Sequence, residues 1–296
     1  MRLTLGISIN QEPFGQARQF APFLSALEHR LEQALKHPVL IDLRLYKSET
    51  NSIRDAARGQ LDLQRMGALP YVLAKQIIPG LEPIVRERTQ KDAVIFASKE
   101  SGISNLTQVA GHRVAFGQTN STISFWAKVH LARAGVHGTN LQSYVHLSGV
   151  RPGRDEIPSR PKGSEDRDSE TQAHKQVIQE VSLSRADVGE APRRPFELNR
   201  YRHGGLVPLL VYRVPSEIYV ARPGLDPEVV RAVQESLVAM QSQWEKDLIA
   251  QLAHNIPIQG FETARDDDFN DIRSAMRREI EAFERGARPG SLETKP

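Results

Sequence analysis

The chain has 296 residues, of which 39% are hydrophobic and 25% are charged, and its formal net charge is +3. This is ordinary globular composition at a length that suits two domains or lobes, and the basic residues are spread along the chain, which argues against nucleic-acid binding. The chain has no cysteine and no apolar run of membrane-spanning length, which excludes disulfides, thiolate metal sites, cysteine nucleophiles and a transmembrane helix.

Strands and helices are expected to alternate in the first part of the chain. The expected strands lie at 3–9, 39–46, 61–66, 82–87 and 93–98. After a loop at 11–16, a helix is indicated by apolar residues at helical spacing, namely Phe20, Phe23, Leu24, Leu27, Leu31 and Leu35. This alternation predicts an α/β chain with largely parallel sheets. The first residues lack the apolar core of a secretory signal, so either the chain stays in the cytoplasm or a signal was removed.

The most informative stretch covers residues 113–124. It is typical of a buried strand at 113–116, a tight turn, and hydroxyl residues that open a helix over 121–134. A helix start has unpaired N–H groups and partial positive charge, so the hydroxyls of Ser121, Thr122 and Ser124 would complete a site suited to an oxyanion. The alternative is that Asn120 or Ser121 only caps the helix.

The second part of the chain begins with a segment unlike the rest. Residues 150–173 are dense in charge and proline and poor in large apolar side chains, so we expect a disordered or mobile insertion. A helix is expected at 174–184, and strands at 186–189, 206–213 and 217–221. A helix after Asp226 should bury residues through Trp244, and a last helix should bury a face that runs from Phe269 to Phe283.

Six short motifs then come in an order typical of one family. They are FAPFL (20–24), RGQLDL (58–63), GALPYVLA (67–74), GHRVAFG (111–117), NST (120–122) and ADVG (186–189). Together, over roughly residues 1–250, they resemble the substrate-binding proteins of phosphate, phosphite and phosphonate ABC transporters. The resemblance implies the type II periplasmic-binding-protein fold, with two α/β lobes and a ligand in the cleft between them. We expect one lobe from 1–90 plus 221–296 and the other from 91–220, with crossings near 88–94 and 207–220.

The resemblance also implies the site and the partners. Ser121 and Thr122 would hold the phosphoryl oxygens, with Ser124 nearby, while Tyr71 and Tyr46 would line the cleft from the other lobe. The family's Ser-Gly-Ser-His element is interrupted here, and its role passes to His174. The expected partners are a small oxyanion ligand and a transporter permease, for a monomer located in the periplasm or lipid-anchored outside the cytoplasm. No cofactor, metal or nucleic acid is expected.

Two departures from the family pattern bear on the ligand. Ile123 stands where the family commonly has a third hydroxyl, and Ser124 follows one place later. Members that bind aminoalkylphosphonates have carboxylates after the ADVG strand, where this chain continues Glu190-Ala191-Pro192-Arg193-Arg194, so an acid to hold an amine is not evident.

The residues and the resemblance together predict a non-catalytic oxyanion receptor for transport, which closes by a hinge. A signalling sensor with the same fold is the main alternative, and a biosynthetic enzyme on this fold is a third. No nucleophile elbow, zinc motif or phosphate-binding P-loop is present, and His130, His137 and His146 are too irregularly spaced to indicate a metal site.

Overall fold

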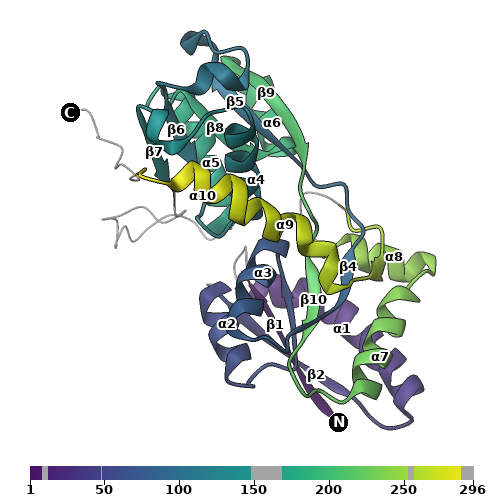
Figure 1. Cartoon of the computed structure of the whole chain (residues 1–296). Coiled ribbons are helices and arrows are strands. Elements are labelled where there is room, and N and C mark those ends of the chain that lie inside the picture. Colours follow the sequence, from purple (N-terminus) through teal and green to yellow (C-terminus); the bar gives the residue numbers. More distant parts are fainter. Residues whose placement is uncertain (9–12, 48, 148–168, 253–256, 288–296) are drawn as a thin grey trace, which may run out of the picture. The chain divides into compact units, whose positions relative to one another are not determined.

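The computed structural model describes residues 1–8, 13–47, 49–147, 169–252 and 257–287. The chain forms two compact units (Figure 1). The first unit is built from Met1–Lys91 and Pro215–Ile272. The second unit is built from Asp92–Val214 and the segment that begins at Arg273.

The first unit has a six-stranded sheet in the order β11-β4-β10-β3-β1-β2. Its strands are β1 (Arg2–Ser8), β2 (Leu40–Tyr46), β3 (Leu63–Met66), β4 (Glu82–Glu87), β10 (Ile218–Ala221) and β11 (Phe261–Thr263). β1 pairs in parallel with β2 and β3, whereas β10 runs antiparallel to β3 and β4. The four strands expected between residues 3 and 87 are confirmed, with small shifts at their ends.

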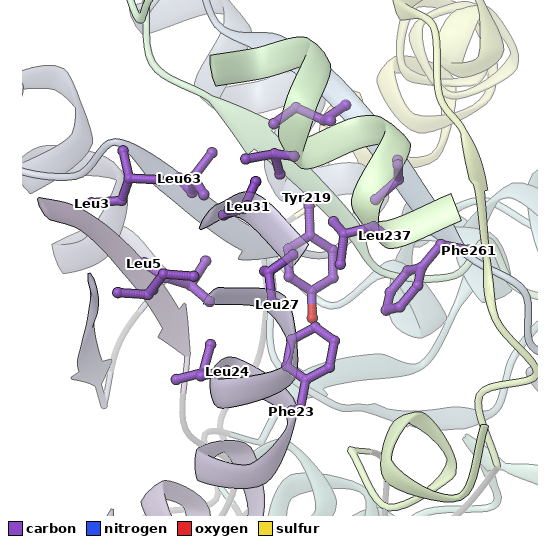
Figure 2. Packing of buried hydrophobic residues seen from close by; sticks show 14 of the residues in the cluster. Leu3, Leu5, Phe23, Leu24, Leu27, Leu31, Leu63, Tyr219, Leu237 and Phe261 are labelled. Atoms are coloured by element: carbon purple, nitrogen blue, oxygen red, sulfur yellow. The ribbon is translucent and has the colours of Figure 1, made fainter. Parts of the chain in front are cut away.

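The first unit also contains helices, of which α1 and α7 contribute many apolar residues to the core of the sheet. These helices are α1 (Pro13–Leu35), α2 (Glu49–Ala57), α3 (Ala68–Ile77), α7 (Pro227–Val238) and α8 (Gln243–Ala250). Figure 2 shows side chains from α1, β1 and α7 gathered beside Tyr219 and Phe261, all of them in one buried cluster. The expected helical face of α1 is therefore confirmed.

Two details of these helices differ from the prediction. The expected loop at 11–16 is wrong from Pro13 onward, where α1 already begins, because proline is well tolerated in a first helical turn that needs no N–H partner. Trp244 was expected to be buried but is 61% exposed. A capping box of Ser242 and Glu245 starts a separate helix there, which changes the direction of the chain after α7.

The second unit has a five-stranded sheet in the order β7-β6-β8-β5-β9. Its strands are β5 (Asp92–Ser98), β6 (Arg113–Phe116), β7 (Ser143–His146), β8 (Val188–Pro192) and β9 (Leu206–Arg213). β6 is parallel to both β7 and β8, and β5 is antiparallel to β8 and β9. The expected alternation of strands and helices is thus confirmed. The expectation of largely parallel sheets is wrong, because antiparallel pairs are at least as common as parallel ones in both sheets.

Both faces of this second sheet are buried. Along β5, Ala93, Ile95 and Ala97 belong to one apolar cluster, whereas Val94 and Phe96 belong to another. Alternate residues of a strand point to opposite faces, so a strand covered on both sides is apolar throughout. The first cluster includes residues of α4 (Thr122–Arg133), and the second includes residues of α5 (Ser169–Ser182) and α6 (Arg193–His203).

The expected insertion at 150–173 overlaps α5. Residues 169–173, predicted to lie in the insertion, are the first residues of this helix, and Ala173 is fully buried. Residues 150–168 of the expected insertion lie outside the described residues. The first residues of α5 are small or polar and add little to an apolar pattern, so the helical periodicity is recognisable in the sequence only from Val177 onward.

From Arg273 onward, the described C-terminal residues belong to the second unit. α9 (Asn270–Ala275) leads through a π-helical turn into α10 (Glu281–Glu284), which lies beside α4 (Figure 1). Phe283 is fully buried in the apolar cluster of α4, and the Lys128 ammonium lies 2.6 Å from Glu284 Oε1. This grouping differs from the expected lobes, which placed 273–296 with the first lobe, because helical periodicity identifies a buried face without identifying its partner.

Candidate functional site

The start of α4 follows β6 through a short loop at the carboxyl edge of the second sheet. Ser121 is the N-cap residue, and its Oγ accepts a hydrogen bond from the Ile123 backbone N–H at 3.2 Å. The side chains of Ser121, Thr122 and Ser124 are all buried. The capping geometry expected at 121 is therefore present, while a part of these hydroxyls in ligand binding stays a prediction.

Ser124 has a defined partner inside the unit. Its hydroxyl donates to Glu190 Oε1 at 2.7 Å, and both side chains are 1% exposed. Glu190 lies on β8, in the same stretch as the ADVG motif. Ser124 thus links the first turn of α4 to the carboxyl half of β8.

Glu190 is the centre of a buried polar cluster. Its Oε1 also accepts a hydrogen bond from the Gly117 backbone N–H at 2.7 Å, and its Oε2 lies 3.2 Å from His174 Nδ1. Burial alone would raise the pKa of Glu190, but His174, the Gly117 N–H and the Ser124 hydroxyl outweigh burial, and the pKa lies below its usual value. The carboxyl group is therefore ionised near neutral pH.

His174 comes to this cluster from α5 and is itself 1% exposed. The structure thus brings together two predicted site residues, Ser124 and His174, around an acid that sequence reasoning did not assign. One signal in the sequence could have indicated Glu190, because it is an acid inside a short apolar strand. An acid that such a strand buries is almost never without a partner, so a buried polar cluster around it could have been expected.

Gly117 lets the loop approach this cluster closely. A Cβ added there would lie 2.7 Å from His174 Cε1 and 3.2 Å from Glu190 Oε1. The distance to the imidazole is shorter than real Cβ contacts, so only glycine fits without displacement of its neighbours.

Two further side chains hold the loop and the helix start. His146, at the end of β7, stacks on Phe116, and its Nδ1 lies 2.8 Å from the Gly117 carbonyl oxygen, which can only accept. Burial lowers the pKa of His146, with Lys128 adding to the effect, so the ring is neutral and donates through Nδ1–H. The Tyr212 hydroxyl donates to the Ile123 carbonyl at 2.9 Å.

The cluster lies where three parallel strands end. Gly117 directly follows β6, His146 is the last residue of β7, and Glu190 is the middle residue of β8, one place beyond Gly189, which pairs with Ala115 near the end of β6. In open α/β sheets, ligands bind outside the carboxyl ends of the strands. Asp187 directly precedes the other end of β8 and has a structural role. Its carboxylate accepts hydrogen bonds from the Arg113 backbone N–H at 2.9 Å and from the Arg113 guanidinium at 2.7 Å.

The two tyrosines predicted for the site belong to the first unit. Tyr71 on α3 is fully buried; its hydroxyl donates to Asp266, and its ring lies 4.7 Å from that of Phe269. Tyr46, at the end of β2, donates to Asp55 Oδ2 at 3.0 Å, and burial, followed by Asp55, raises its pKa. Their part in ligand binding stays a prediction.

Neither a metal-binding cluster nor a membrane-spanning helix is present among the described residues. Among residues 1–8, 13–47, 49–147, 169–252 and 257–287, no group of three or more histidine, aspartate or glutamate side chains is placed to hold a metal ion. In the same part of the chain, no helix has the length and apolar character needed to cross a membrane.

Comparison with known structures identifies the fold. PhnD1 from Prochlorococcus marinus in complex with methylphosphonate is 16% identical, with a TM-score of 0.67 over 94% of this chain and 97% of that one. A binding protein component of an ABC phosphonate transporter from Pseudomonas aeruginosa is 14% identical, with a TM-score of 0.66 over 95% and 87%. The aliphatic sulphonate binding protein SsuA from Escherichia coli is 14% identical, with a TM-score of 0.60 over 95% and 93%. The fold is therefore that of the type II periplasmic binding proteins, as expected.

Sequence comparison identifies the family. No curated protein sequence matches the chain significantly. The family model of the periplasmic substrate-binding proteins of phosphonate ABC transporters matches residues 5–269. This match covers most of the chain, and it agrees with the order of motifs from FAPFL to ADVG. The protein therefore belongs to the family of periplasmic substrate-binding proteins of phosphonate ABC transporters.

Proposed function

We propose that this protein binds a small phosphorus oxyanion, with a phosphonate as the first candidate, at the start of α4, and delivers it to a transporter permease. The observation that carries the proposal is the buried N-terminus of α4 with Ser121 and Thr122, placed at the carboxyl ends of β6, β7 and β8. Positive partial charge and N–H donors at a helix start favour an anion. Family membership supports the same ligand class.

The roles of the hydroxyls differ in this proposal. Ser121 and Thr122 donate to the phosphoryl oxygens. Ser124, whose hydroxyl donates to Glu190, fixes the first turn of α4 against β8. The protein acts as a monomeric receptor in the periplasm, the compartment of its family, and performs no chemistry on its ligand.

A ligand panel tests the substrate class. Calorimetry with methylphosphonate, phosphite, phosphate, 2-aminoethylphosphonate and methanesulfonate should give the tightest binding for one of the phosphorus oxyanions. Glu190 already accepts two hydrogen bonds through Oε1 and has His174 at 3.2 Å from Oε2, so 2-aminoethylphosphonate should bind no tighter than methylphosphonate, because its ammonium would find no unoccupied acid there. Tightest binding of methanesulfonate would overturn the phosphorus assignment, since a sulfonate-binding protein shares this fold.

A substitution at Thr122 tests the site itself. Thr122→Val keeps the shape of the side chain and removes its hydroxyl, and a hydrogen bond to a charged acceptor is worth about 1.5–3 kcal/mol. Methylphosphonate binding should therefore weaken by roughly 10- to 150-fold with little change in melting temperature. The matched control is Thr107→Val, an exposed threonine of the same unit, which should leave affinity unchanged. Equal affinity of Thr122→Val and wild type would remove Thr122 from the site.

A further inference from the structure

Glu190 is a buried anion next to the place where an anionic ligand is proposed to bind. Its carboxylate is 1% exposed and accepts hydrogen bonds from the Gly117 backbone N–H and from the hydroxyl of Ser124, which lies in the first turn of α4. An uncompensated buried charge is very costly, and a second anion nearby would add repulsion. A positive group must therefore balance Glu190 if this end of the unit is to accept an oxyanion.

Most neighbouring charged groups do not supply that balance. Lys128 from α4 forms an ion pair with Glu284 from α10 at 2.6 Å, so their charges largely cancel. Arg113 on β6 is paired with Asp187. On α6, Arg193 lies about half exposed at the surface and pairs with Asp92 and Glu197.

Two other titratable side chains that interact with Glu190 are neutral. Burial lowers the pKa of His146 from β7, and burial raises the pKa of Tyr212 from β9 well above its usual value, with Glu190 as a further cause. Neither ring carries charge near pH 7. His174 remains, with Nδ1 at 3.2 Å from Glu190 Oε2 and the whole ring enclosed between α5 and the Gly117 loop.

We propose that Glu190 is a positioning residue that holds His174 in its protonated form, so that His174 supplies a buried positive charge beside the start of α4 for the anionic ligand. The role in ligand binding rests on the proposed function, whereas the pairing itself does not. Glu190 orients the ring through Oε2 and fixes the loop and the helix through Oε1. The carboxylate and the imidazolium together are neutral, which leaves the helix start free to attract the ligand.

The pairing can be tested without any ligand. Histidine ring resonances of the full chain, with the His174 signals assigned by their loss in His174→Gln, are followed from pH 5 to 9. In the wild type, His174 should stay protonated above the ordinary histidine value of about 6.5. In Glu190→Gln its titration midpoint should fall by about one to three pH units, the usual effect of removing a close opposite charge. Asp187→Asn, directly before the same strand, should leave the midpoint unchanged.

The role in binding has its own measurement. The dissociation constant of methylphosphonate is measured for Glu190→Gln and for wild type across the same pH range. The ratio of the variant's constant to that of wild type is then compared between pH values, because the ionisation of the ligand affects both constants equally and cancels in the ratio. The ratio should rise with pH by up to about tenfold per unit as His174 loses its proton in the variant only. A ratio that does not depend on pH would overturn the role of the pair in binding.

The two arms separate the possible failures. A wild-type His174 that titrates at or below about 6.5 overturns the proposal outright, and this result does not depend on whether the variant folds. If methylphosphonate and the other oxyanions do not bind wild type at all, the proposed function fails, and the ring titration still decides whether Glu190 holds His174 protonated.

Discussion

At Gly117 a single methyl group would meet two buried groups at once. The added Cβ would lie 2.7 Å from His174 Cε1 and 3.2 Å from Glu190 Oε1, and the imidazole is enclosed and cannot move into solvent. The residue type at this position is thus set by the close approach of a loop to a buried ring. A tight turn can account for many of the other glycines of the chain, but at Gly117 it is the nearby ring that excludes a side chain.

Gly117→Ala should therefore damage both folding and binding. Overpacking of a buried site costs about 1–3 kcal/mol, and displacement of His174 should weaken methylphosphonate binding as well. Urea unfolding and calorimetry on the same variant measure the two effects. In a His174→Ala background the ring is absent, so the same glycine substitution should cost clearly less stability. An equal cost in both backgrounds would show that the clash with His174 is not the cause.

The element that best shows the limits of local reasoning is the C-terminal helix. α10 buries Phe283 in the cluster of α4 and β6, and Lys128 lies under 6 Å from the ring centroids of Phe116, Tyr144 and Phe283. The ion pair of Lys128 with Glu284 adds a charged contact to the apolar one. This short helix therefore completes the core of the unit that holds the candidate site.

Phe283→Ala should destabilise the second unit by about 3–5 kcal/mol, the usual cost of removing a buried phenylalanine. In a Trp244→Phe background, Trp126 of the second unit is the one remaining tryptophan, so fluorescence during urea unfolding reports that unit. Glu281→Ala, an exposed change on the same helix, serves as the control and should stay within about 0.5 kcal/mol of wild type. Equal midpoints for both variants would show that α10 does not stabilise this unit.

Across the molecule, most of the pKa shifts of acidic groups and histidines change the stability of the fold in the same direction as pH changes. Arg113 outweighs burial and lowers the pKa of Asp187, and Glu190 and Glu245 are lowered through their own partners. Burial lowers the pKa of His146. In each case the folded state binds protons less readily than the unfolded state, so the stabilisation is present above the unfolded pKa and is lost as pH falls. Glu87 acts in the opposite sense, because burial raises its pKa.

Stability should accordingly decline on the acid side. Urea midpoints should begin to fall as pH drops below the unfolded histidine value of about 6.5, and should fall more steeply below about 4.3, where the carboxylates are protonated. Above about pH 6.5 the proposed protonated His174 acts in the opposite sense, because its stabilisation is lost as pH rises. Asp187→Asn should lower the midpoint at pH 7 and flatten the steep acid part of the curve. Midpoints that rise as pH falls from 6.5 to 4 would show that groups such as Glu87 dominate.

The sequence by itself determined the elements, the family and the start of α4. Periodicity of apolar residues in α1 and the strand–turn–hydroxyl pattern before Thr122 are local, and local patterns survive into the fold because they depend only on backbone geometry and nearest neighbours. Only the tertiary structure decided that Glu190 joins Ser124 and His174, and that α10 belongs with α4. These contacts join residues far apart in the chain, and spacing along the sequence carries no information about which buried faces and charges will meet. A buried acid can be recognised as needing a partner from sequence alone, but the partner is chosen by the packing of the sheet and its helices.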